Sequence, residues 1–170
     1  MRSTLILLTL FGVLAVSCED RSIAVSPETQ LAIDIEKIDT YLAENGITAE
    51  QHVSGLRYVI HNQGEGDRPG PDKCVRVNYK VWHLGELETI DEGTNFATPL
   101  APGTPIILGW RIGLKEIQKG GSMTLYVPSG LAYGPGGFSN IPRNQVLVFY
   151  IELLNLTGYN AAAGYCYPWP

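Results

Sequence analysis

The residues of this sequence that could do chemistry are mainly aromatic and branched apolar side chains, not nucleophiles or metal ligands. The three histidines, His52, His61 and His83, are scattered and share no spacing typical of a metal site. The sequence contains no G-x-S-x-G nucleophile motif and no phosphate-binding glycine loop. A hydrolase, a metalloenzyme or a nucleotide enzyme is therefore not indicated, and we expect no cofactor. Aromatic residues on loops and strand ends, with few polar partners, are typical of a shallow apolar pocket.

One glycine-rich stretch, residues 131–142, carries three of these apolar side chains: Tyr133, Phe138 and Ile141. We call residues 131–142 the flap segment. It connects two predicted strands, residues 123–127 and 146–154, although two to five residues are enough for a hairpin turn. A simple turn explains neither the length of this segment nor its apolar side chains, which would be exposed to water in a turn.

The elements that position these residues begin with a predicted helix. Ser26-Pro27-Glu28 has the features of a helix start, because it combines an N-cap, a proline at the first helical position and an acid in the first turn. Apolar residues recur with the spacing of one helical face, and Asn45-Gly46 is a stop signal. We expect this helix to pack on the domain or on a second copy of itself. Its apolar face consists of Leu31, Ile35, Ile38 and Leu42.

Alternating apolar and polar residues then predict several antiparallel strands. The last of them places Leu147, Phe149, Ile151 and Leu153 on one face. Residues 106–119 predict one short helix, because Trp110, Leu114 and Ile117 have helical spacing. The expected fold class is therefore α+β, a curved antiparallel sheet covered by one short helix and preceded by an amphipathic helix.

The N-terminus predicts an exported protein. Arg2 precedes an apolar run, residues 5–16, that is too short to span a bilayer and fits a secretory signal. Residues 14–18 resemble a bacterial lipobox, in which Cys18 is lipidated after removal of residues 1–17, and residues 18–26 then form a tether. The alternative is an ordinary cleaved signal. The expected location is the bacterial cell envelope, with a lipid anchor in the membrane and the domain facing the periplasm or cell surface.

Charge and cysteine content limit the remaining partners and bonds. The formal net charge of −5, with no long basic run, argues against a nucleic-acid partner. In an oxidising compartment Cys74 and Cys166 either form one disulfide or remain separate thiols, and the sequence does not decide between these states.

Several blocks of the sequence resemble FKBP-type peptidyl-prolyl cis-trans isomerases. The blocks are residues 106–114, 127–134, 141–142 and 146–153, and Val77-Asn78-Tyr79 resembles the first pocket strand of that family. The resemblance covers about residues 55–156. It implies an FKBP-like domain at residues 55–157, with residues 27–54 as helix and linker and residues 158–170 as a tail without an assigned function. The helix and lipobox resemble the arrangement of lipoprotein members of the family.

The resemblance also implies a role for each pocket residue. Trp110 forms the floor of a proline site, and the Ile107 N–H and the Tyr133 hydroxyl donate hydrogen bonds to the bound peptide. The flap segment closes over the proline, with Phe138 at its tip, which explains its apolar side chains. The implied ligands are proline-containing polypeptides and a macrolide inhibitor. The implied walls are Tyr79, Ile106, Ile107, Tyr133, Ile141 and Phe149.

The family has a Phe-Asp pair that this sequence matches in only one position of two. In one alignment Ile90-Asp91 occupies the pair and Phe96 is a later wall residue. In the other, Phe96 is the pocket aromatic and Ala97 replaces the acid. We favour the first, because it keeps the spacing from Phe96 to Trp110 closer to that of the family. Asp91 is then expected to position Tyr133 or to interact with a rotating carbonyl group.

The predicted function is isomerisation of X–Pro bonds in envelope or exported proteins, without covalent catalysis. The altered Phe-Asp pair leaves open a peptide-binding chaperone or assembly module with little turnover. The chain is expected to be a monomer or a dimer that pairs through the N-terminal helix.

Overall fold

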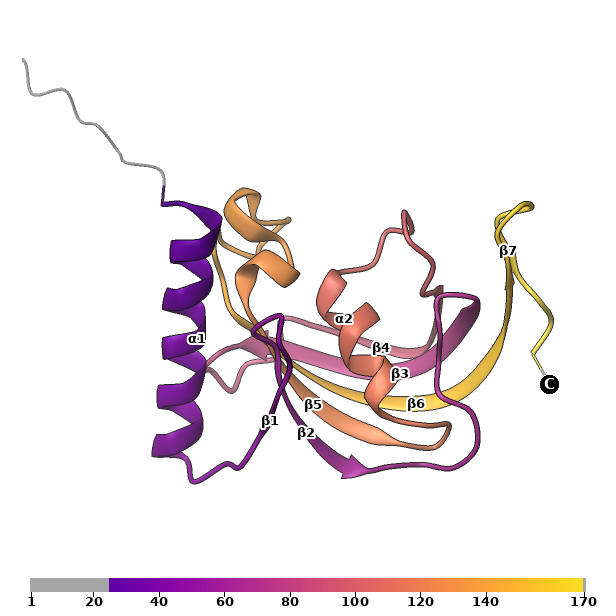
Figure 1. The fold of residues 1–170 in the computed structure, drawn as a ribbon, viewed down its shortest axis with the longest axis horizontal. Helices are drawn as coiled ribbons and strands as arrows, with labels where there is room; N and C mark the ends of the chain where they lie inside the picture. The colour runs from indigo at the N-terminus through magenta and orange to yellow at the C-terminus, as the bar shows by residue number, and fades with distance from the viewer. Residues whose placement is uncertain (1–24, 170) are drawn as a thin grey trace, which may run out of the picture.

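The structure, a computed structural model, describes residues 25–169. Its centre is a curved antiparallel sheet, and one short helix lies against the concave side of that sheet (Figure 1). The strands lie in the order β1-β2-β5-β6-β3-β4, and β7 pairs with the far end of β6. The strands are β1 (Glu50–Gln51), β2 (Arg57–Asn62), β3 (Lys73–His83), β4 (Asp91–Pro99), β5 (Ser122–Val127), β6 (Leu147–Asn160) and β7 (Tyr165–Cys166). The helices are α1 (Pro27–Glu44) and α2 (Leu108–Gly113), with 3₁₀ turns η1 (Leu114–Glu116), η2 (Ser129–Leu131) and η3 (Gly134–Gly136).

The predicted fold class is confirmed. The main core lies between α2 and the concave face of the sheet, and the inward-facing residues of β6 are buried in it as the alternation predicted. Burial of this apolar surface, at roughly 25 cal/mol per Å², is the main force that holds helix and sheet together. β6 is longer than the predicted strand and continues into the C-terminal tail.

Helix α1 starts and ends at the predicted signals. The Ser26 side chain accepts a hydrogen bond from the Thr29 N–H, Pro27 is the first helical residue, and Gly46 follows the helix with φ +62°. Ile38 and Leu42 are buried on the opposite face of the sheet from the main core, in a cluster completed by Tyr126, Val146 and Val148. The helix therefore packs on its own domain, as one of the two alternatives predicted.

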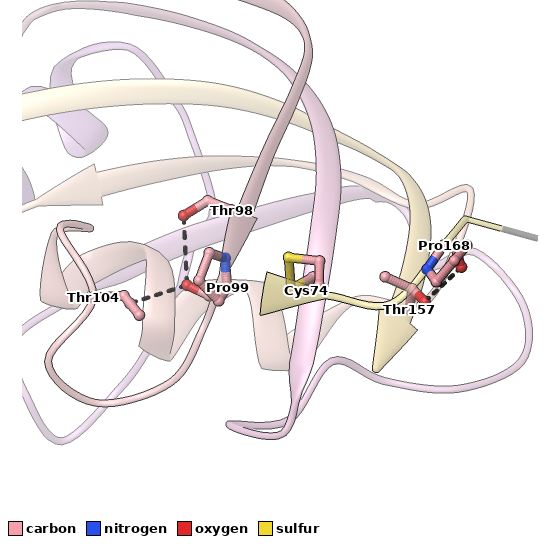
Figure 2. Close-up of a disulfide and its surroundings, with 7 residues drawn as sticks. Cys74, Thr98, Pro99, Thr104, Thr157 and Pro168 are labelled. Carbon is pink, nitrogen blue, oxygen red and sulfur yellow. Dashed lines mark hydrogen bonds between the residues drawn. A yellow bond between two sulfur atoms is a disulfide. The ribbon is translucent and has the colours of Figure 1, made fainter. Parts of the chain in front are cut away.

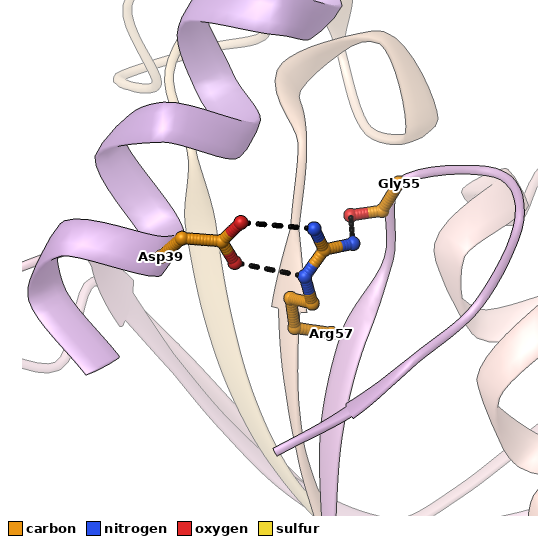
Figure 3. A network of polar contacts seen from close by, with 3 residues as sticks. All are labelled: Asp39, Gly55 and Arg57. Atoms are coloured by element: carbon orange, nitrogen blue, oxygen red, sulfur yellow. Dashed lines mark hydrogen bonds and ion pairs between the residues drawn. The ribbon is translucent and has the colours of Figure 1, made fainter. Parts of the chain in front are cut away.

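An ion pair also fixes α1 to the sheet (Figure 3). Arg57 on β2 donates to both carboxylate oxygens of Asp39, at 2.8 and 3.0 Å, and to the Gly55 carbonyl oxygen at 3.2 Å. The Arg57 side chain is only 8% exposed, so this pair forms at the boundary of the core.

The tail is tied to the sheet by a disulfide between Cys74 on β3 and Cys166 on β7, with the Cα atoms 5.8 Å apart (Figure 2). Beside it, Thr157 donates a hydrogen bond to the Pro168 carbonyl oxygen, and the Arg76 guanidinium lies 4.3 Å from the centre of the Trp169 ring. The structure thus decides the open question about the two cysteines in favour of the disulfide. No helix within residues 25–169 has the length and apolar character needed to cross a bilayer.

Candidate active site

A cleft of about 680 Å³ opens between the concave face of the sheet, α2 and the flap segment. We call it the Trp110 cleft. Its side chains are mainly aromatic and branched apolar, with Asp91 as the charged exception. Thirteen of its fourteen residues are thus uncharged, so the cleft offers a bound group mainly apolar contacts. The lining consists of Tyr79, Val81, Asp91, Phe96, Thr104, Pro105, Ile106, Ile107, Trp110, Ala132, Tyr133, Phe138, Ile141 and Phe149.

Trp110 forms the floor of the cleft and is 4% exposed. Three rings meet it edge-on: Tyr79 at 5.1 Å, Phe149 at 5.6 Å and Phe96 at 6.2 Å between ring centres. Edge-to-face packing is the arrangement that the charge distribution of aromatic rings favours. The indole Nε1 has no hydrogen-bond partner within residues 25–169. The result is a rigid apolar base held by rings from β3, β4 and β6.

The start of α2 places a backbone donor at the edge of this base. Ile107 is the N-cap residue, with extended backbone angles, and Leu108 is the first helical residue. N–H groups at a helix start lack partners inside the helix, so the Ile107 N–H is available to a ligand in the cleft.

Tyr79 and Asp91 form the polar pair of the cleft. The Tyr79 hydroxyl donates to the Asp91 carboxylate at 2.8 Å. Burial, with this hydrogen bond and the Asp91 charge, raises the pKa of Tyr79 to about 12. Burial, with the Asp91 charge, also raises the pKa of Tyr133. Both phenols are therefore protonated at neutral pH. Tyr79 donates to Asp91, while the Tyr133 hydroxyl has no partner among the described residues and can donate to a ligand.

The flap segment is folded and lies over the cleft. The Tyr133 and Phe138 rings stack at 5.0 Å and 12° between planes, and Phe138 is 61% exposed. Phe138 and Ile141 exchange two backbone hydrogen bonds across a tight turn. Gly137 in this turn has φ +65°, and a Cβ there would lie 2.6 Å from the Ile141 carbonyl oxygen, so the turn requires glycine.

The structure brings together every predicted pocket residue except Ile90. Ile90 packs against the main core, and its N–H donates to the Val81 carbonyl oxygen, but it does not line the cleft. Phe96 occupies the aromatic position beside Trp110, as in the alignment that we did not favour, whereas Asp91 from the favoured alignment supplies the carboxylate. Ile90 as a pocket residue is therefore a wrong expectation.

A bulge in β4 explains why neither alignment fits alone. Val77 pairs with Phe96 but Tyr79 pairs with Gly93, so β4 contains one residue more than β3 over this stretch. Asn95 has φ +54° within the bulge, and its N–H donates to the Asn78 side chain at 3.0 Å. Bulges turn side chains relative to a regular strand, which sequence spacing cannot show.

The cleft also contains residues that the sequence analysis missed: Val81, Thr104, Pro105 and Ala132. Val81 continues the inward alternation of β3 after Val77 and Tyr79, so that pattern could have identified it. Thr104 and Pro105 lie in an irregular loop, where no periodic signal exists.

A second depression, of about 600 Å³, lies between α1 and residues 144–146. Its lining includes three charged residues of α1, Glu36, Lys37 and Glu44, and a single aromatic residue, Tyr41. It lacks a rigid apolar base, so the Trp110 cleft is the better candidate for a small apolar group. Residues 25–169 contain no group of three or more acidic, histidine or cysteine side chains that could hold a metal ion.

Comparisons with known proteins identify the part of the chain that contains the cleft. A family model for "FKBP-type peptidyl-prolyl cis-trans isomerase" matches residues 66–154, which include every residue of the lining. FkpA of Escherichia coli is 35% identical over 125 residues, and a probable FkpA of Neisseria meningitidis is 37% identical over 131 residues. The matches cover 69% and 71% of this chain but 43% and 46% of those proteins, so the chain spans less than half of their length.

Solved structures give the same match. The crystal structure of Escherichia coli FkpA has a TM-score of 0.65 and 32% identity, covering 77% of this chain and 62% of that chain. A peptidyl-prolyl cis-trans isomerase from Pseudomonas syringae has a TM-score of 0.64 and 25% identity, covering 77% of this chain and 96% of that chain.

Proposed function

Because the chain belongs to the FKBP-type peptidyl-prolyl cis-trans isomerase family, we propose that it isomerises X–Pro bonds of exported or envelope proteins in the Trp110 cleft. The observation that carries the proposal is the Trp110 ring with three rings packed edge-on against it, beside two donors, the Ile107 N–H and the Tyr133 hydroxyl, that have no partner among the described residues. The proline ring lies on the Trp110 indole, and the Ile107 N–H and the Tyr133 hydroxyl hold the flanking peptide carbonyl groups.

The apolar lining accounts for acceleration of the rotation. Amide resonance raises the rotation barrier to about 18–20 kcal/mol, and exchange without a catalyst takes roughly tens to hundreds of seconds. Resonance separates charge between oxygen and nitrogen, and the twisted transition state loses this separation. The transition state therefore needs less solvation than the planar amide, and a water-poor cleft favours it. Each gain of about 1.4 kcal/mol is a tenfold gain in rate.

Asp91 orients the walls of the cleft in this mechanism. By accepting a hydrogen bond from the Tyr79 hydroxyl at 2.8 Å, it holds the Tyr79 ring edge-on to Trp110. Its charge also favours the protonated, donating form of Tyr133. Ala97 occupies the acid position of the unfavoured alignment, so Asp91 fulfils the acid's role from an earlier position on β4.

A protease-coupled assay on a short X–Pro peptide, with a macrolide as competitor, tests this function. Trp110→Ala should lower kcat/KM by more than about tenfold, because it removes the floor. Tyr133→Phe should lower kcat/KM by about two- to tenfold, the range of one hydrogen bond. Trp82→Ala and Tyr150→Phe are matched controls, because neither residue lines the cleft.

The alternative function, a peptide-binding module, predicts a different result in the same experiment. Such a module would bind peptide or macrolide with little or no turnover in the wild-type protein. This alternative remains a candidate because the Phe-Asp pair is altered: Asp91 supplies the acid, and Ala97 stands at the position after Phe96. The α1 face that covers the domain supports a monomeric protein for either function.

For location, we propose a lipid anchor on Cys18 in the bacterial envelope. Cys18 and the signal at residues 1–17 lie outside the described residues, and the Cys74–Cys166 disulfide supports export to an oxidising compartment. Cys18→Ser should move the protein from the membrane to the soluble fraction and abolish labelling with radioactive palmitate. A labelled, membrane-bound Cys18→Ser protein would refute the anchor.

A further inference from the structure

Asp34 on α1 is a fully buried carboxylate that the site described above does not use. One of its oxygens, Oδ2, accepts hydrogen bonds from the Ser129 N–H at 2.8 Å and the Ser129 hydroxyl at 2.5 Å. The other, Oδ1, accepts from the Gln30 side chain at 2.8 Å. Both oxygens are thus satisfied, as a buried carboxylate requires.

Ser129 opens the turn η2, whose last residue, Leu131, is the first residue of the flap segment. Ser129 is 1% exposed, and its carbonyl oxygen accepts a hydrogen bond from the N–H of Ala132, which precedes Tyr133. Figure 1 shows the orange chain that carries η2 beside the N-terminal half of α1. A single side chain on α1 therefore holds the base of the segment that carries Tyr133, Phe138 and Ile141.

Docking of α1 does not require this arrangement. Ile38, Leu42 and the Asp39–Arg57 pair already attach the helix to the sheet. Burying a carboxylate is unfavourable until its hydrogen bonds compensate for the lost water, and an apolar side chain would dock the helix without that cost. Directional hydrogen bonds instead select one position of the partner backbone, which apolar packing alone does not do.

We propose that Asp34 is a positioning residue for the isomerase site: by fixing Ser129, it sets the position of the flap segment over the Trp110 cleft. The N-terminal helix is then part of the catalytic unit and not only a spacer. The effect on turnover rests on the proposed function, whereas the effect on the flap segment does not.

The test compares two carboxylates of the same helix in the full chain. Asp34→Ala should lower kcat/KM at least about tenfold and accelerate amide hydrogen exchange of residues 131–138 at least about tenfold. Asp39→Ala, which releases α1 from β2 alone, should leave both quantities within about twofold of wild type while lowering the melting temperature. Asp34→Asn retains an acceptor for Ser129 and should restore most of the activity.

Ser129→Ala removes one of the two bonds from the other side and provides a second variant if Asp34→Ala does not fold. It should accelerate exchange in the flap segment to a smaller extent. The proposal is overturned if exchange in residues 131–138 is unchanged in both variants, or if Asp34→Ala and Asp39→Ala lose activity in parallel with melting temperature. If the wild-type protein has no turnover, the proposed function fails, and the exchange data alone decide whether Asp34 positions the flap segment.

Discussion

The Tyr79 hydroxyl shows how one residue can serve structure and chemistry together. It donates to Asp91, its ring contacts Trp110, and its ring also lies against the Gly93 backbone. Burial and the neighbouring carboxylate stabilise the protonated phenol, which raises the pKa of Tyr79 to about 12. The stability of the cleft therefore depends on this proton.

This raised pKa predicts a loss of stability at high pH. The ordinary tyrosine pKa is about 10. Because the folded-state pKa is higher, the contribution is fully present below about pH 10 and is lost as pH rises toward about 12. Melting temperature measured from pH 9 to 12 should fall less steeply in Tyr79→Phe than in wild type.

Tyr58 requires a control in that experiment, because burial and Glu50 also raise the pKa of Tyr58 to about 12. Absorbance at 295 nm should show a late tyrosinate phase that shrinks in Tyr79→Phe and in Tyr58→Phe, and shrinks further in the double variant. Identical high-pH titrations of Tyr79→Phe and wild type would contradict the assignment.

Gly93 gives a second prediction at the residue scale. A Cβ at this position would lie 2.4 Å from Tyr79 Cε1, so Gly93→Ala must displace the ring from Trp110. We expect a loss of about 1–3 kcal/mol in unfolding free energy, together with lower kcat/KM. Gly130→Ala is the matched control, because nothing lies within 4 Å of its Cβ position and its φ is not positive. Equal stability of Gly93→Ala and Gly130→Ala in urea denaturation would contradict this prediction.

At the scale of elements, local sequence signals located α1 because its determinants are local. Ser26 caps the first turn and Gly46 follows the last, each within a few residues of the helix end. The bulge in β4 is different. It arises from pairing with β3 and from the Asn78 side chain contacting Asn95, and these contacts do not exist until the sheet forms. Sequence spacing therefore placed Ile90 in the cleft incorrectly.

The attachment of α1 predicts unequal effects of two ion pairs. Asp39→Ala leaves the buried Arg57 guanidinium without its carboxylate and should cost about 1–3 kcal/mol in unfolding free energy. The Lys80–Glu92 pair is exposed on both sides, so Glu92→Ala should cost less than about 1 kcal/mol. Urea denaturation measures both costs, and a smaller cost for Asp39→Ala than for Glu92→Ala would contradict this view of α1.

At the scale of the whole molecule, the ends of the described chain are attached to opposite sides of the domain. Figure 1 shows α1 at one side of the sheet and β7 at the other, and the Cys74–Cys166 disulfide closes a loop with a sequence separation of 92. Such a closure restricts the unfolded chain more than the folded one.

Removal of this disulfide should therefore destabilise the domain with little effect on its chemistry. The double variant Cys74→Ser, Cys166→Ser should lose about 2–4 kcal/mol in urea denaturation. Activity per folded molecule should be retained, because neither cysteine lines the Trp110 cleft. Reductant should shift the urea midpoint of the wild-type protein by as much as the double substitution does. A wild-type midpoint that does not respond to reductant would contradict the presence of the disulfide.

The sequence by itself determined the fold class, the limits of α1, the inward face of β6 and most of the cleft, from Trp110 to the flap segment. These features follow from periodicity, from caps and turns, and from blocks that resemble a family. Only the tertiary structure decided that Phe96 and Asp91 share the pocket, that Cys74 meets Cys166, and that Asp34 holds Ser129. Each of these contacts joins residues through strand register or through packing across the fold, and register and packing are set by the whole chain rather than by any local stretch of it.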